Sequence, residues 1–224
     1  MKKFAFIALA AIIGLSSCGG PKSVKNFSEQ DSVAYALGTD LGRYLKNLDS
    51  TLNLNVVQLG IEDAVKGQEQ INMDDAYAFL NEYFMVRVPA RNLEESEAFL
   101  KKVANENPNV KVTESGLLYE IIEMGDENLK PSDLADEVMV TYKGTLKNGE
   151  IFDQNDSISF RLGGVIQGWQ EGMKLIGEGG KINLWIPPHL GYSTQSRGKI
   201  KANDALVFEV ELHQVNTVEM QGRK

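Results

Sequence analysis

The sequence predicts an α+β protein, in which an all-helical N-terminal domain precedes a twisted antiparallel β-sheet wrapped over one short helix. Between residues 28 and 107, apolar residues recur every three or four positions, which is typical of amphipathic helices. Between residues 117 and 215, short runs of β-branched and aromatic residues are separated by turn residues, which is typical of strands. Asn148-Gly149 lies between two of these runs and favours a type I′ hairpin, because both residues tolerate a positive φ.

The composition limits the possible classes of protein. A chain of 224 residues suits two domains of modest size, and a hydrophobic content of 42% is enough for real cores. The formal net charge of −8 argues against nucleic acid as a partner, because phosphate binding requires a basic surface. Beyond the N-terminus, no stretch is apolar for the roughly 20 residues that a membrane-spanning helix needs. The sequence therefore does not resemble an integral channel or transporter.

The first residues form a targeting segment. Lys2-Lys3 gives a charged start, and an apolar run follows from Phe4 to Leu15. The run ends in Leu15-Ser16-Ser17-Cys18-Gly19, which resembles the lipobox of bacterial lipoproteins. The resemblance implies cleavage before Cys18 and acylation of that residue, and two or more acyl chains anchor a protein firmly. Under the alternative interpretation, Cys18 is a free thiol in an ordinary signal peptide that is discarded.

The cysteine content supports the lipid anchor. Cys18 is the only cysteine, so the chain cannot form an internal disulfide, and acylation gives this single thiol a role. We therefore expect residues 1–17 to be a signal peptide and residues 18–27 to be a lipidated tether. The expected location is the bacterial cell envelope, with the lipid in the outer membrane and the protein facing the periplasm.

Three helices are expected in the N-terminal part. The first follows a capping box at Ser28, and its apolar stripe consists of Val33, Leu37, Leu41, Tyr44 and Leu48. The second is expected to begin with Asn55 as its cap and to end at Gly67, with a buried face of Val57, Ile61, Ala64 and Val65. The third begins after Asn72 and runs to Val103, with inward-facing side chains at Ala76, Tyr77, Phe79, Leu80, Tyr83, Phe84, Leu93, Phe99 and Leu100.

Two prolines interrupt this helical part. Pro89 lacks an amide donor and clashes with the preceding helical turn, which predicts a kink or break near residues 85–88. Pro108 marks the boundary to the next domain. Three helices of this size have a thin core and many aromatic residues, and such an excess of apolar surface usually belongs to a partner interface.

The C-terminal part is expected to be rich in strands. The predicted strands cover residues 117–124, 137–146, 151–153, 157–161, 181–186 and 205–215. Only residues 168–176 have a helical pattern there, with Trp169, Met173 and Ile176 on one side.

Four motifs carry a family resemblance. They are Val140-Thr141-Tyr142-Lys143-Gly144, Phe152-Asp153, Val165-Ile166-Gln167-Gly168-Trp169 and Leu206-Val207-Phe208-Glu209-Val210. Together they resemble the FKBP-type peptidyl-prolyl cis–trans isomerases, whose apolar cup binds proline. The resemblance covers about half of the chain, and it implies the same α+β fold as the strand pattern.

The resemblance also implies a set of site residues. The apolar cup would be lined by Tyr142, Phe152, Val165, Ile166, Trp169, Ile200 and Phe208, with Asp153 and Tyr192 at its rim. The Ile166 amide and the Tyr192 hydroxyl would bind carbonyl groups of the peptide, and the Trp169 ring would form the floor. As an alternative, Trp169, Phe208 and Val165 are ordinary core residues. A lone acid beside Phe152 favours the pocket, because burial of a carboxylate without a partner is costly.

A second resemblance concerns the helices. Tyr35-Ala36-Leu37-Gly38-Thr39-Asp40-Leu41-Gly42, Gly60-Ile61-Glu62-Asp63-Ala64 and Ser115-Gly116-Leu117-Leu118-Tyr119 resemble the N-terminal domain of macrophage-infectivity-potentiator-type isomerases. That resemblance implies a homodimer in which these helices interlock. We therefore expect a dimerisation domain at 28–110, an isomerase domain at 111–217 and a tail at 218–224. A monomeric helical spacer is the alternative.

These motifs predict a peptidyl-prolyl cis–trans isomerase that assists the folding of exported proteins with X–Pro bonds. The alternative is a non-catalytic chaperone with a degenerate pocket. The family commonly has Tyr-Gly and Ile-Pro-Pro where this chain has Tyr192-Ser193 and Ile200-Lys201-Ala202. Loss of both prolines should loosen the loop between residues 193 and 203. The resemblance also implies binding of the family's macrolide inhibitors.

Metal and cofactor chemistry is not expected. His189 and His213 are isolated from any further ligand cluster. Asp153, Asn155 and Ser157 have the spacing of a calcium loop, but its sixth position is Ile158 rather than glycine.

Overall fold

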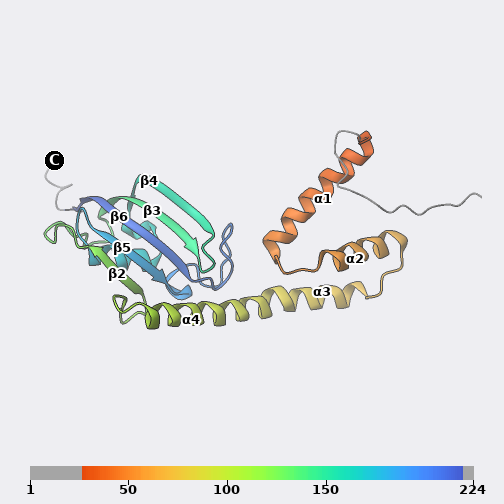
Figure 1. Cartoon of the computed structure of the whole chain (residues 1–224), viewed down its shortest axis with the longest axis horizontal. Helices are drawn as coiled ribbons and strands as arrows, with labels where there is room; N and C mark the ends of the chain where they lie inside the picture. The colour runs from red at the N-terminus through yellow and green to blue at the C-terminus, as the bar shows by residue number, and fades with distance from the viewer. Residues whose placement is uncertain (1–26, 219–224) are drawn as a thin grey trace, which may run out of the picture. The chain divides into compact units, whose positions relative to one another are not determined.

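The computed structural model describes residues 27–218, which form two compact units divided between Gly67 and Gln68 (Figure 1). The predicted signal peptide, Cys18 and the tether up to residue 26 lie outside the described residues, as does the tail from residue 219. Among residues 27–218, no helix combines the length and the apolar character needed to cross a bilayer.

The first unit contains helices α1 (Glu29–Leu48) and α2 (Leu54–Lys66). The predicted capping box is confirmed, because the Ser28 hydroxyl accepts the Asp31 amide at 3.1 Å and the Asp31 carboxylate accepts the Ser28 amide at 3.3 Å. The predicted cap of α2 is wrong by two residues. Asn53 is the cap, and its side-chain oxygen accepts the amide of Asn55. Gly67 ends α2 at a φ of 64°, the left-handed conformation that favours glycine.

Neither helix of the first unit has a buried residue. The predicted stripe of α1 is on the surface, with Leu37 67% and Tyr44 62% exposed. The predicted buried face of α2 is also wrong for the single chain, since Ile61 is 46% and Val65 is 83% exposed. A periodic pattern identifies the apolar side of a helix, but it does not say which molecule covers it.

The second unit begins with helix α3 (Met73–Glu82), which Asn72 caps as predicted. A π-helical turn (Tyr83–Arg87) joins it to helix α4 (Val88–Glu106), so the two helices follow one another along one rod (Figure 1). The predicted break upstream of Pro89 takes the form of this turn, in which the Val88 amide bonds the Tyr83 carbonyl. In a regular α-helix the Pro89 ring would clash with the carbonyl group of residue 85. The wider π-helical turn suits such a site. Tyr77, Phe79 and Leu80 are exposed, not inward-facing.

The rest of the second unit is a six-stranded antiparallel sheet, with strand order β1-β2-β5-β6-β3-β4. The strands are β1 (Lys111–Val112), β2 (Leu118–Glu123), β3 (Glu137–Leu146), β4 (Ile151–Arg161), β5 (Lys181–Ile186) and β6 (Leu206–Asn216). The fold class is confirmed, although the short strand β1 was not predicted. Two predicted strands at 151–153 and 157–161 are one strand, β4, because bulges replace the expected break.

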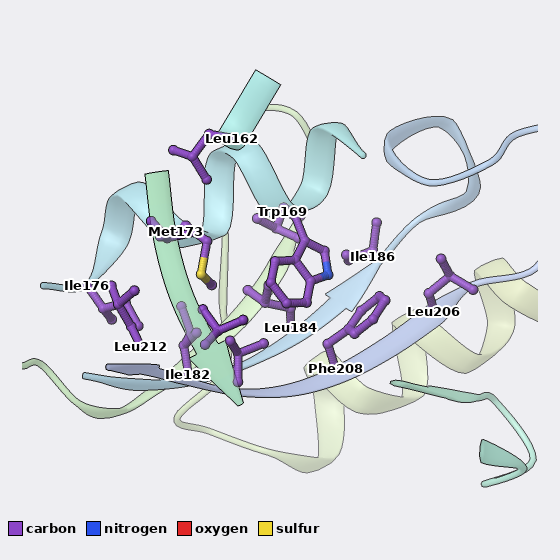
Figure 2. Close-up of a cluster of buried hydrophobic side chains, with 14 of the residues drawn as sticks. Leu162, Trp169, Met173, Ile176, Ile182, Leu184, Ile186, Leu206, Phe208 and Leu212 are labelled. Atoms are coloured by element: carbon purple, nitrogen blue, oxygen red, sulfur yellow. The ribbon is translucent and has the colours of Figure 1, made fainter. Parts of the chain in front are cut away.

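The core of this unit lies between the sheet and the short helix α5 (Gln167–Gly172), which continues as a 3-10 turn (Met173–Leu175). Trp169 is 4% exposed, and Met173 and Ile176 are fully buried, as the helical pattern predicted. Figure 2 shows Trp169 and Met173 within a cluster that includes the sheet residues Leu184 and Phe208. Helix α4 adds a smaller cluster, in which Leu100 meets Leu118, Ala205 and Trp185.

A buried carboxylate fastens the end of β6 to the loop before β3. Asp136 is fully buried and accepts the amides of Ser132, Asp133 and Val218 at 2.8–2.9 Å. Burial of the carboxylate favours its neutral form, but these amides and the charge of Lys174 outweigh burial and hold the pKa of Asp136 below its ordinary value.

We expect Asp136→Asn to lower the free energy of unfolding at pH 7 by about 1.5–3 kcal/mol, the range for hydrogen bonds to a charged group. Because the folded pKa is depressed, this stabilisation is present above the unfolded value of about 3.9 and is lost as pH falls through the folded pKa. Urea unfolding of both proteins between pH 7 and pH 3 checks this. A difference that does not shrink in acid would contradict it.

Candidate functional site

A pocket of about 420 Å³ opens beside α5, between β4 and the loop after β5. Its walls consist of Tyr142, Phe152, Asp153, Ile158, Phe160, Gly164, Val165, Ile166, Trp169, Tyr192, Arg197 and Phe208. Every predicted pocket residue except Ile200 is among them. Ile200 is 5% exposed and belongs to the core behind the pocket.

The strand β4 brings Phe152 and Asp153 to the same pocket. Consecutive residues of a regular strand point to opposite faces of the sheet. Here Gly144 pairs with Asp153 while Thr145 pairs with Ile151, which leaves Phe152 as an extra residue in a bulge. A second irregularity lies between the pairs Val140–Ile158 and Tyr142–Asn155. Bulges change the direction in which side chains point. The bulge at Phe152 therefore allows the Phe152 ring and the Asp153 carboxylate to share one wall of the pocket.

The floor of the pocket is a cluster of aromatic rings around Trp169. The indole makes edge contacts with Tyr142, Phe208 and Phe160, with ring centroids 5.2–5.3 Å apart. Phe152 packs edge-on against Phe208 at 5.4 Å. These separations lie within the range that aromatic pairs prefer, so the rings hold one another in place. The result is a rigid and mostly apolar surface.

One polar interaction stands out in this apolar setting. The Tyr142 hydroxyl donates a hydrogen bond of 2.7 Å to the Asp153 carboxylate. Burial, followed by this hydrogen bond and the negative charge of Asp153, raises the pKa of Tyr142 well above its ordinary value. Tyr142 therefore stays neutral at physiological pH and keeps Asp153 oriented at the rim.

The sequence prediction missed three side chains of the pocket. Ile158 and Phe160 are two residues apart on β4, so their alternation was a signal that both share the face of the pocket. Arg197 lies in an irregular loop, where no periodic signal exists. Its guanidinium lies 5.4 Å from the centroid of the Tyr192 ring, the distance of a cation–π contact.

Comparisons with known proteins agree with this geometry. Residues 129–213 match the family described as FKBP-type peptidyl-prolyl cis-trans isomerase, and residues 30–121 match the domain amino terminal to it. The FKBP-type peptidyl-prolyl cis-trans isomerase FkpA of Escherichia coli strain K12 is 35% identical over 206 residues, covering 83% of this chain and 75% of that protein. This chain belongs to the FKBP-type peptidyl-prolyl cis–trans isomerases. A probable FKBP-type isomerase of Haemophilus influenzae is 31% identical and covers 96% of this chain and 98% of its own length.

Solved structures support the same assignment for this FKBP-type isomerase. The crystal structure of FkpA from Escherichia coli has a TM-score of 0.57 at 34% identity, covering 84% of this chain and 97% of that one. A peptidyl-prolyl cis-trans isomerase of Pseudomonas syringae has a TM-score of 0.53 at 32% identity, covering 57% of this chain and 95% of its own. The family and fold predicted from the four motifs are confirmed.

Proposed function

We propose that this FKBP-type isomerase binds proline over the Trp169 ring and rotates the X–Pro bond inside the pocket. The observation that carries the proposal is one carboxylate, Asp153, held by Tyr142 at the rim of an aromatic wall. An aromatic wall of this kind can bind the apolar ring of a proline. Its single acid, Asp153, can orient the peptide backbone next to that ring. The substrate class is a flexible peptide segment with an X–Pro bond.

Rotation of a peptide bond needs neither a nucleophile nor proton transfer. Resonance sets the barrier at roughly 18–20 kcal/mol, and an uncatalysed X–Pro event takes about 10–100 s. Shortening that time to about ten milliseconds requires roughly 10³–10⁴-fold, or about 4–5.5 kcal/mol. The twisted amide has lost its charge-separated resonance form, so its carbonyl is less polar. A dry aromatic pocket therefore disfavours the planar ground state more than the twisted transition state.

Two donors would hold the bound peptide. Among residues 27–218, neither the Ile166 amide nor the Tyr192 hydroxyl donates a hydrogen bond to another residue. Ile166 precedes the first turn of α5, where amides lack partners within the helix. Both groups border the pocket, so each is available to a carbonyl of the bound peptide. Fixed donors of this kind stabilise a transition state without reorganisation during the reaction.

A double-mutant cycle tests the Tyr142–Asp153 pair. We expect Tyr142→Phe and Asp153→Ala each to lower kcat/KM about tenfold, and the double variant to lose little more than either one, because interacting residues are not additive. The assay is cis-to-trans isomerisation of an Ala-Leu-Pro-Phe peptide. Additive losses would show that the hydrogen bond does not support catalysis. Ile122→Ala on β2, outside the pocket, is the control.

We infer further that the isomerase is a homodimer through its N-terminal helices. The support is the stripe of α1, where Val33, Leu37, Leu41 and Tyr44 share one helical face and are 38–67% exposed. A single chain that leaves such a face in water has an uncovered apolar patch, which usually marks an interface. The homodimer covers this patch with an identical one, as two-fold symmetry requires.

We propose finally that the chain acts on exported proteins and is held to a membrane of the cell envelope by acyl chains on Cys18. The support is the apolar N-terminal run that ends in Leu15-Ser16-Ser17-Cys18-Gly19. Growth of expressing bacteria with a labelled fatty acid should label the wild-type protein and leave Cys18→Ser unlabelled. Equal labelling of both proteins, or of neither, would contradict the anchor.

A further inference from the structure

Helix α4 makes a polar contact with the loop that follows the core residue Ile200. The Asn92 amide group donates to the Ala202 carbonyl at 2.6 Å and to the Asp204 carboxylate at 2.9 Å. One helical turn later, the Ser96 hydroxyl donates to the Asn203 carbonyl at 2.8 Å and accepts the Ala205 amide at 3.0 Å. Residues four apart face the same side of a helix. This side of α4 therefore forms hydrogen bonds with each of residues 202–205 of the loop.

This contact, which we call the latch, is buried. Ser96 is fully buried, and Asn92 and Asp204 are each 7% exposed. Lys147, at the end of the β3–β4 hairpin, bonds the Asn92 side-chain oxygen and lies 3.5 Å from the Asp204 carboxylate. Buried polar groups are costly without partners, whereas a fully paired network fixes one arrangement of its parts. The latch therefore determines where the loop lies on α4.

The loop on α4 is also hydrogen-bonded to the segment that carries the pocket residue Tyr192. The Asn203 amide donates to the carbonyl of Ser193, the residue after Tyr192, at 2.7 Å. Ser193 and Asn203 both have a positive φ, 54° and 62°, which costs a non-glycine residue energy and persists only where the surroundings impose it. The Asn203 side chain also donates to the Pro89 carbonyl of α4. Tyr192 is thus two hydrogen bonds away from the helix.

The residues that replace the two family prolines take part in this arrangement. The Lys201 amide donates to the Asp204 carboxylate at 2.7 Å, and the Ala202 amide donates to the Ser196 hydroxyl at 3.1 Å. A proline at either position has no amide to donate. We expected a looser loop from the loss of these prolines, but the structure has hydrogen bonds at both positions.

We propose that Asn92 and Ser96 of α4 are positioning residues for the isomerase site, because they hold the loop that presents Tyr192 to the peptide. The proposal rests on the proposed pocket around Trp169. Neither residue lines that pocket, and both act through residues 202–205. Helix α4 is thereby a structural component of the proposed site.

Asn92→Asp in the full chain is the sharpest test, since it preserves shape and replaces both donors by a carboxylate beside Asp204. We expect kcat/KM for the Ala-Leu-Pro-Phe peptide to fall about tenfold at pH 8, because small displacements of binding groups have large effects on rate. The introduced carboxylate lies at a buried position beside Asp204, with Glu95 nearby, and Lys147 contacts this group of acids. Burial and the neighbouring negative charges raise the pKa of one carboxyl group, and the single positive charge of Lys147 opposes this rise only in part. As pH falls through that raised value, one carboxyl group regains a proton to donate, so the activity of the variant relative to wild type should recover.

Two further variants keep the test decisive. Ser96→Ala should lower kcat/KM without recovery in acid, because it removes a hydroxyl rather than exchanging charge. Val103→Ala removes an apolar contact between α4 and the sheet and leaves the latch intact, so it controls for loss of stability. Urea unfolding of each variant gives that loss.

The outcomes separate the positioning role from the proposed site. An active wild type with Asn92→Asp and Ser96→Ala equally active would overturn the positioning role alone. An equal loss of kcat/KM in Val103→Ala, or a loss in Asn92→Asp that does not depend on pH, would overturn it as well. A wild type without isomerase activity would remove the proposed function and the positioning role together.

Discussion

Gly144→Ala is expected to lower kcat/KM for proline peptides by about 10²-fold, the scale on which displaced binding groups act. A Cβ atom at this position would lie 2.7 Å from the Phe152 ring and 2.9 Å from the Phe208 ring. Carbon atoms do not approach so closely, so the two rings or the strand β3 must shift, which disturbs the aromatic wall. Overpacking of this kind costs about 1–3 kcal/mol of stability. The isomerase assay and urea unfolding, applied together, measure both effects.

Gly60→Ala is the matched control for this substitution. A Cβ on Gly60, in α2, meets no atom within 4 Å. We expect kcat/KM of that variant to equal the wild-type value. Full activity of Gly144→Ala would contradict this prediction, because catalysis would then not depend on the positions of the Phe152 and Phe208 rings.

Leu37→Glu is expected to convert the inferred homodimer into a monomer at micromolar concentration. Leu37 is 67% exposed at the centre of the α1 stripe, and a charge there is buried without a partner when two stripes meet. Such burial costs several kcal/mol per ion, and a two-fold interface imposes it twice. Light scattering of the eluting protein measures the mass directly.

The control for the dimer is Thr39→Glu, which adds the same charge to an exposed position of α1 outside the stripe. We expect this variant to remain a dimer. A wild-type protein with the mass of one chain would contradict the dimer itself. A dimer that tolerates Leu37→Glu would place the interface on another surface.

Local patterns predicted much of the fold. The capping box at Ser28, the cap at Asn72 and the buried side of α5 all follow from residues close together in sequence. The cap of α2 was misplaced because Asn53 and Asn55 are both good caps, and only the backbone distinguishes them. The strand β4 was divided in two because a bulge and a turn leave the same gap in an alternating pattern.

The candidate site shows where sequence reasoning ends. The four motifs placed Tyr142, Phe152 and Trp169 together because family resemblance carries long-range information that periodicity lacks. Arg197 and the latch had no such signal, since Asn92 and Asp204 are 112 positions apart and meet only in the folded chain. Polar residues at positions 92 and 96, in line with Leu100 on the inward side of α4, were a clue that this side contacts something polar.

The pocket around Trp169 is proposed to rotate X–Pro bonds. The most direct measurement is the cis–trans exchange rate of an Ala-Leu-Pro-Phe peptide, followed by magnetisation-exchange NMR with the wild type and with Tyr192→Phe, Asp153→Leu. We predict acceleration of roughly 10³–10⁴-fold over the uncatalysed rate for the wild type, which the double variant loses. Equal exchange rates with the two proteins would contradict the claim.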